Sequence, residues 1–181
     1  MDIQLTSPRL IIRALAPGDL HAFAQYRALP EVALYQSWSH YSYQDACRLY
    51  ENMNRQAFAS VGHWFQLALI EQDTHTLIGD LAVFFIDKRQ VEIGVTLAPE
   101  YQGRGLAGEA IYALLDYLFL ELKKHRVTAV TDAGNQACSR LLKGIGFRQE
   151  AHFVDNIYFK GAWGSEYVFA MLASDWSRLR C

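Results

Sequence analysis

The sequence contains few cysteines, and those it has show no pairing or ligand pattern. Cys47, Cys138 and Cys181 are an odd, scattered set, and no CxxC or Cys/His spacing typical of a metal site occurs. The six histidines include no HExxH motif. We therefore expect reduced thiols, a cytoplasmic location and no bound metal.

Long apolar runs and blocks of like charge are missing too. No apolar run reaches the roughly 18 residues that would span a bilayer. Residues 1–15 lack the basic and then apolar regions of a signal peptide. The net charge is −2, without a Lys/Arg block. These absences argue against a membrane or a nucleic acid as the main partner.

What the sequence does contain is enough apolar residues for one folded domain. Hydrophobic residues make up 51% of the 181 residues, and a chain of this length buries roughly 70% of the surface that its unfolded form exposes. No linker, repeat or low-complexity segment interrupts it. We expect a single domain over residues 1–181 that folds without disulfides or metal.

Strand-like and helix-like segments alternate along the chain, which predicts an α/β (α+β) domain. Tight turns join the early strands and predict antiparallel neighbours, whereas one long helix predicts a single parallel crossover. Ser42 is an expected helix N-cap, and Gly144 with Gly146 is expected to stop the last helix. The predicted strands are residues 9–15, 63–71, 77–87, 90–98, 126–132, 147–154 and 165–172, and the predicted helices are residues 16–29, 41–59, 103–124 and 135–147.

The segment "EYQGRGLAGEA" (100–110) fits two motifs. Gly103, Gly105 and Gly108 form the GxGxxG of a dinucleotide-binding fold, with Asp132 placed to bind a ribose. However, "APEYQ" separates the strand from the first glycine, and only about 70 residues remain after Gly108 for the further βαβ units that such a fold needs. A nicotinamide-dependent enzyme is therefore the weaker alternative.

The second motif, Q-x-x-G-x-A, starts at Gln102 and also suits a pyrophosphate. Backbone N–H groups of this loop can turn around the phosphate oxygens at the positive end of the helix, and the glycines let the backbone approach without a Cβ. Arg104 can add a charged contact. The candidate phosphate-binding residues are Gln102, Gly103, Arg104, Gly105, Leu106, Ala107 and Gly108. The alternative is a glycine-rich helix start that binds nothing.

Four stretches in order resemble the GNAT superfamily of N-acetyltransferases, in the branch of ribosomal-protein N-terminal (alanine) acetyltransferases. They are "TSPRLIIRALAPGDL", "IGVTLAPEYQGRGLAGEAI", "GNQACSRLLKGIGF" and "YFKGAWGSEYVFAMLASDW". The resemblance covers about residues 6–176. It implies the GNAT fold, a mixed, mostly antiparallel sheet of about seven strands flanked by helices, in which a splayed parallel strand pair holds the cofactor.

The resemblance also implies the reaction: acetyl-CoA, as cosubstrate, gives its acetyl group directly to a primary amine of a protein N-terminus or a small molecule. Metal is not needed, and a monomer or homodimer is expected. The main chains of Ile93, Val95 and Leu97 would pair with the pantetheine arm. Gly94 would mark a bulge or a close approach whose N–H stabilises the oxyanion. Asn135 is either a ligand of the arm or a helix N-cap.

The chemistry needs a base, because an alkylamine with a pKa near 10.4 is mostly protonated at neutral pH. Glu92, on the strand that faces the thioester, is the first candidate, and Glu166 and Asp80 are weaker ones. Where many GNAT enzymes carry an acidic Tyr, this chain has Leu142. The proton for the thiolate would come from Ser139, Cys138 or water, or the thiolate would leave unprotonated.

The acceptor side gives weaker signals. The aromatic stretch "YQSWSHYSY" (35–43) suits either an acceptor pocket or a cover over the core. His63 and Tyr158 are candidate linings, and no acidic cluster of the kind that holds a polycation stands out. Because the usual Tyr is missing, a non-catalytic acyl-CoA-binding sensor or scaffold stays as an alternative function. Binding without transfer to a broad panel of amines would favour it.

Overall fold

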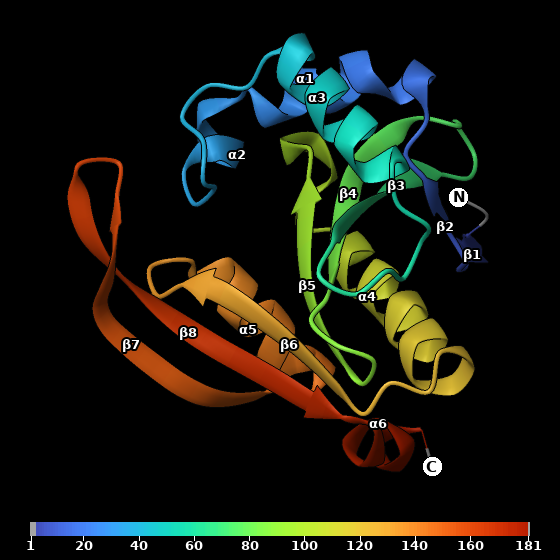
Figure 1. Ribbon diagram of the computed structural model, residues 1–181, viewed down its shortest axis with the longest axis vertical. Coiled ribbons are helices and arrows are strands. Elements are labelled where there is room, and N and C mark those ends of the chain that lie inside the picture. The colour runs from blue at the N-terminus through green and yellow to red at the C-terminus, as the bar shows by residue number, and fades with distance from the viewer. Residues whose placement is uncertain (1–2, 181) are drawn as a thin grey trace.

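One mixed sheet runs through the chain, which the computed structural model describes from residue 3 to residue 180 (Figure 1). Its eight strands lie in the order β1-β2-β3-β4-β5-β6-β8-β7. Only β5 and β6 pair in parallel, and every other neighbouring pair is antiparallel. The strands are β1 (Gln4–Thr6), β2 (Leu10–Ala14), β3 (Trp64–Glu71), β4 (Leu77–Phe85), β5 (Gln90–Leu97), β6 (Arg126–Asp132), β7 (Arg148–Phe159) and β8 (Ala162–Leu172).

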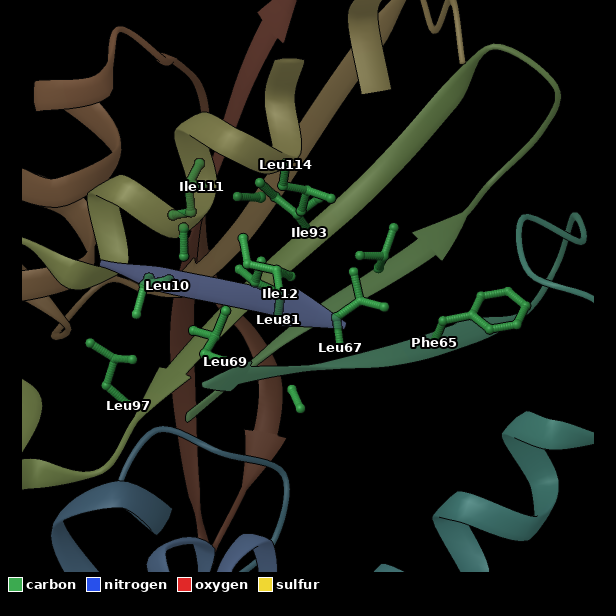
Figure 2. Close-up of a cluster of buried hydrophobic side chains, with 14 of the residues drawn as sticks. Leu10, Ile12, Phe65, Leu67, Leu69, Leu81, Ile93, Leu97, Ile111 and Leu114 are labelled. Carbon is green, nitrogen blue, oxygen red and sulfur yellow. The ribbon is translucent and has the colours of Figure 1, made fainter. Parts of the chain in front are cut away.

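Helices cover both faces of the sheet (Figure 1). Asp80 on β4 points to one face, where it bonds to Arg27 at the end of α1. Its neighbour Leu81 points to the other face, toward α4, because side chains alternate along a strand (Figure 2). The helices are α1 (Leu20–Arg27), α2 (Pro30–Ala33), α3 (Tyr43–Asn54), α4 (Leu106–Asp116), α5 (Gln136–Ile145) and α6 (Ala173–Leu179).

The core lies between the sheet and α4. Leu67 on β3, Leu81 on β4 and Ile93 on β5 gather beneath Ile111 and Leu114 of α4 (Figure 2), and all five are nearly fully buried. This packing fixes the strand register, because a slip by one residue would turn each apolar side chain away from α4. The opposite side chains of the same strands are thereby presented to α1 and α3.

The observed sheet confirms the predicted mixed, mostly antiparallel architecture with one parallel crossover. A single parallel pair does not build the doubly wound sheet of a dinucleotide-binding fold. The sheet has eight strands rather than about seven, because β1 pairs with β2 at the edge. The expected cap is also confirmed, since Ser42 Oγ accepts from the N–H of Asp45 while the Asp45 carboxylate accepts from the N–H of Ser42.

Several predicted bounds are wrong for local physical reasons. The long helix begins at Leu106 rather than at Gly103, because Gly103 and Gly105 have positive φ angles of 71° and 77°. Gly144 lies inside α5, and only Gly146, with a φ of 111°, ends it. The helix predicted to run to residue 59 ends at Asn54.

The last two strands are longer than predicted and form one long hairpin, β7 and β8 (Figure 1). They turn at Lys160 and Gly161, which both have positive φ, as a two-residue hairpin turn requires. Two short helices, α2 and α6, were also not predicted.

Candidate functional site

A split between two strands opens the site. β5 and β6 pair only from Gln90↔Arg126 to Glu92↔Thr128 and then separate. β6 stays paired with β8 as far as Asp132, so the gap opens on the side of β5. A cavity of about 420 Å³ lies there, between the segments 93–96 of β5 and 129–132 of β6.

The main chain of β5 faces this gap at alternate residues. The N–H of Ala98 bonds to Ile78 on β4, whereas the carbonyl of Val91 accepts from Thr128 on β6. Since main-chain groups alternate in direction along a strand, Val91, Ile93, Val95 and Leu97 present theirs toward β6. Pairing with β6 ends at Glu92, so those of Val95 and Leu97 have no strand partner on this side. They are placed as a pantetheine arm would need.

Gly94 does not form the expected bulge. It pairs in regular register with Ala82 on β4. A Cβ built on Gly94 would lie 3.7 Å from the Ala82 side chain, which is an ordinary contact. No close approach within the protein therefore requires a glycine here, and the space above it belongs to the cavity.

The glycine loop presents unpaired donors at the start of α4. None of the backbone N–H groups from Gly103 to Gly108 has an acceptor within residues 3–180, and Gly105 caps the helix without a side-chain bond. Gln102 anchors the loop by donating from Nε2 to the carbonyl of Leu97 at 3.0 Å. Unpaired N–H groups at a helix N-terminus fit an anion such as a diphosphate.

The side chain of Arg104, in the glycine loop, forms only weak contacts in this structure. Its guanidinium, half exposed, contacts Glu71 at 3.3 Å and lies over the ring of Tyr101. Exposed pairs of this length are weak, so the side chain remains available to a phosphate.

An N-terminal anchor of this loop was not predicted. The Glu109 carboxylate, in the first turn of α4, accepts from Ser7 Oγ, from the N–H of Arg9 and from Arg9 Nε, each at 2.7 Å. Arg9 also donates to the carbonyl of Arg104 at 3.0 Å. Partial burial raises the pKa of Glu109, but these hydrogen bonds outweigh it and hold the pKa below its usual value. The turn between β1 and β2 thus fastens the loop.

Three carboxylates gather on the face of the sheet away from α4. Asp132 and Glu166 are cross-strand partners on β6 and β8, and both line the cavity. Glu92 lies on the same face of β5, two residues before Gly94, although its side chain is not among the cavity walls. Burial, and then the charge of Glu166, raise the pKa of Glu92. No acidic cluster stands out in the sequence because Asp132 and Glu166 come from distant segments, which the pairing of β6 with β8 brings together.

Asp80 is not placed to act as a base. Its side chain is 1% exposed and forms an ion pair with Arg27 at 2.8 Å. Tyr26 also donates its hydroxyl to Asp80. The Asp80 carboxylate is therefore occupied by Arg27 and Tyr26. Of these three residues, only Arg27 lines the cavity.

The short helix α5 supplies another wall. Asn135 Oδ1 accepts from the N–H of Cys138 at 3.0 Å, so Asn135 caps the helix, and it also lines the cavity. Cys138 and Leu142 line the cavity as well, whereas Ser139 does not, and its buried hydroxyl has no partner among the described residues. Burial raises the pKa of the Cys138 thiol, although a bond with Thr131 opposes this.

The aromatic stretch 35–43 takes both expected roles, since some of its residues line the cavity and others cover the core. Tyr35 and Trp38 line the cavity, whereas Tyr41 packs edge-on against buried Phe23. His63 lies in a second cavity next to the first. The expectation for Tyr158 is not met, since it is 63% exposed on the long hairpin and lies outside both cavities.

Two contacts bridge the top of the cavity. Tyr35, in the segment after α2, donates to the carbonyl of Gly134 at 3.3 Å. Lys160, at the turn of the long hairpin, donates to the carbonyl of Ala33. The end of α2 thus contacts the hairpin turn, and the segment after α2 contacts the loop that follows β6.

Comparisons with known proteins agree with this geometry. Residues 9–148 match the acetyltransferase (GNAT) domain family. The uncharacterized N-acetyltransferase YnaD of Bacillus subtilis is 30% identical over 97% of this chain and 100% of its own length. The spermidine N(1)-acetyltransferase of Vibrio cholerae is 28% identical over 84% of this chain and 87% of its own.

A ribosomal protein uS5-alanine N-acetyltransferase of Escherichia coli is 24% identical over 97% of this chain and 93% of its own. Among solved structures, a GNAT-family acetyltransferase from Bacillus anthracis superimposes with a TM-score of 0.85 at 25% identity, over 95% of this chain and 99% of its own.

Proposed function

The chain belongs to the GNAT family of acetyltransferases and is an acetyl-CoA-dependent N-acetyltransferase, and we propose that it transfers the acetyl group directly to a primary amine held by Asp132 and Glu166, with Glu92, next to the cavity residue Ile93, as the base. The observation that carries this proposal is the strand split, which runs from the unpaired N–H groups of the loop to a cavity lined by carboxylates. A cationic amine is the ligand that such a cavity suits.

Acetyl-CoA would lie along the split. The N–H groups from Gly103 to Gly108 would hold the diphosphate, Gln102 would support the loop through its side-chain bond to Leu97, and Arg104 would add a charged contact. Val95 and Leu97 would pair with the amides of the arm, with Ile93 at the end of the pairing. Asn135 caps α5 through Oδ1, and its Nδ2 would be free to donate to the arm.

The amine would lose a proton and attack the thioester. We assign the base to Glu92, because burial and the charge of Glu166 raise its pKa toward the working range. Asp132 and Glu166 would hold the ammonium before the transfer. The ammonium first releases one proton to solvent by way of Glu92. The neutral amine nitrogen then bonds to the carbonyl carbon, its next proton passes to Glu92, and the C–S bond breaks.

The thiolate leaves as the anion in this scheme. Ser139 lies off the cavity and would not protonate the sulfur directly. A thiol titrates near 8.5, so its anion is an acceptable leaving group. The proton on Glu92 can then return to the thiolate or pass to solvent.

The test measures release of the CoA thiol from acetyl-CoA with a panel of primary amines. Glu92→Gln should lower kcat by about 10²- to 10⁴-fold while CoA binding, followed by calorimetry, stays within about twofold. Glu166→Gln should mainly raise KM for the amine. Full activity of Glu92→Gln would remove Glu92 as the base, and CoA binding without transfer to any amine would favour a sensor.

We also propose a cytoplasmic location. The thiols of Cys47 and Cys138 are free, which suits a reducing compartment. Within residues 3–180, the structure has no helix long and apolar enough to cross a membrane.

A further inference from the structure

A second cavity adjoins the first. It has a volume of about 700 Å³ and lies between α3, the segment before it and the start of β3. The two cavities share one wall, formed by Arg27, Ser37, Trp38, Trp64 and Gln66. A ligand with its amine in the first cavity therefore has room for a larger body beyond this wall.

The walls of the second cavity carry two polar atoms that lack partners. Gln66 Oε1 and the Tyr41 hydroxyl are buried, and neither has a hydrogen bond among the described residues. Gln66 lines both cavities and Tyr41 lines the second. A buried polar atom left unpaired is costly, and native proteins normally supply it with water or a ligand. These two atoms therefore point to a polar ligand.

The charges of the second cavity argue against a second ammonium. Arg27 is neutralised by the buried carboxylate of Asp80. The Asp45 carboxylate already accepts from Ser42 and pairs with Arg48. Asp45 is thus the one carboxylate among the described residues that lines this cavity, and it has a counter-charge. In the first cavity, Asp132 and Glu166 accept hydrogen bonds from Gly134 and Asn156 and form no ion pair within the described residues.

The apolar walls add a shape requirement. Trp64 is 48% exposed and stacks on Phe84, so its other side is open to a ligand. Trp38 is fixed by its indole N–H, which donates to the carbonyl of Arg27 at 3.0 Å. Fixed indole rings favour a flat or apolar group next to the polar one.

Building on the proposed function, we propose that the second cavity binds the body of a peptide-like acceptor, whose free α-amine lies in the first cavity. The carboxamide of Gln66 would accept from a peptide N–H and donate to a carbonyl, and Tyr41 would take a further carbonyl. An apolar side chain of the acceptor would lie against Trp38 and Trp64. An aliphatic polyamine, with several cations and no carbonyl, matches this cavity poorly.

The experiment compares three acceptors at saturating acetyl-CoA: the dipeptide amide Ala-Phe-NH2, spermidine and n-butylamine. We expect kcat/KM for the dipeptide amide to exceed the other two at least tenfold. Gln66→Leu and Tyr41→Phe should each lower it by about two- to tenfold, the effect of one uncharged hydrogen bond, and leave n-butylamine unchanged. The exposed matched controls, Gln149→Leu and Tyr43→Phe, should change neither.

Each other outcome is decisive. If spermidine is acetylated as well as the dipeptide amide, or if both cavity variants weaken all three acceptors equally, the assignment of the second cavity is wrong while the acetyltransferase proposal stands. If no amine is acetylated although CoA binds, both proposals fall.

Discussion

Asp80→Asn should strongly destabilise the protein, because it leaves a buried guanidinium without its counter-charge. The side chains of Arg27 and Asp80 are 4% and 1% exposed, and Nη2 and Oδ2 are 2.8 Å apart. The rings of Phe23 and Trp38 also pack against the guanidinium, whose carbon lies 4.2 and 4.5 Å from the two ring centres. Breaking such a pair costs about 3–5 kcal/mol.

That loss is a large part of the total, since a domain is stable by only about 5–15 kcal/mol. At a shift of roughly 2–4 °C per kcal/mol for this chain length, the Tm should fall by about 6–20 °C. Urea unfolding followed by circular dichroism measures the change. Arg27→Met should cost a similar amount, and the double variant should cost clearly less than the sum of the two.

A matched control separates burial from loss of charge. Arg48→Met removes an exposed guanidinium, 68% exposed beside Asp45, and should cost less than about 1 kcal/mol. If Asp80→Asn also costs less than that, or if the costs of the two buried variants simply add, the ion pair is not the stabilising unit that its geometry suggests.

Three further changes test other contacts. Gly79→Ala should lower the free energy of unfolding by about 1–3 kcal/mol, because its Cβ would lie 2.2 Å from the carbonyl oxygen of Thr96; urea unfolding measures this. Glu109→Ala should raise KM for acetyl-CoA about tenfold, the worth of one charge-assisted hydrogen bond, and leave KM for the amine unchanged in steady-state assays. Hydrogen bonding to Arg126, against the effect of desolvation, lowers the pKa of Glu150 to about 2. Its stabilisation is therefore full above about pH 4.5 and is lost as the pH falls toward 2, and Glu150→Gln should flatten that part of a stability curve measured by urea unfolding at several pH values.

The contrary results are equally clear. Gly94→Ala is the control for Gly79→Ala, since its Cβ meets nothing closer than 3.7 Å, and equal losses would reject the steric argument. Parallel rises in both KM values for Glu109→Ala would mean that the change disturbs the whole site, and would reject a local role in anchoring the loop. An unchanged pH curve for Glu150→Gln would reject the low pKa.

Local features of the sequence predicted the fold well, because neighbouring residues determine them. The N-cap Ser42 and its partner Asp45 are only three residues apart, and the crossover from β5 to β6 follows from one amphipathic helix. The start of that helix was predicted three residues too early, because Gly103 and Gly105 adopt a positive φ and form a loop before it. Gly144 was wrongly predicted to help end α5, because the sequence alone does not distinguish a glycine inside a helix from one that ends it.

Features built across the sheet were out of reach of the sequence. Glu92, Asp132 and Glu166 come together only because β6 lies between β5 and β8. Gln66 carries no motif, and only its buried, unpartnered oxygen makes it notable, whereas Tyr41 was noted only as part of the aromatic stretch 35–43. The Lys160–Gly161 turn is the exception, since a two-residue turn ending in glycine is a recognisable hairpin signal.

The anchor between Arg9 and Glu109 also affects the order of folding. A contact between residues 100 positions apart is slow to form, because closing a long loop of chain costs entropy before the contact can stabilise the fold. On the ribosome, this anchor can form only after α4 has been synthesised. The loop proposed to hold acetyl-CoA would thus be completed late, and a cosubstrate that binds only the finished loop would report that the first strands have joined α4.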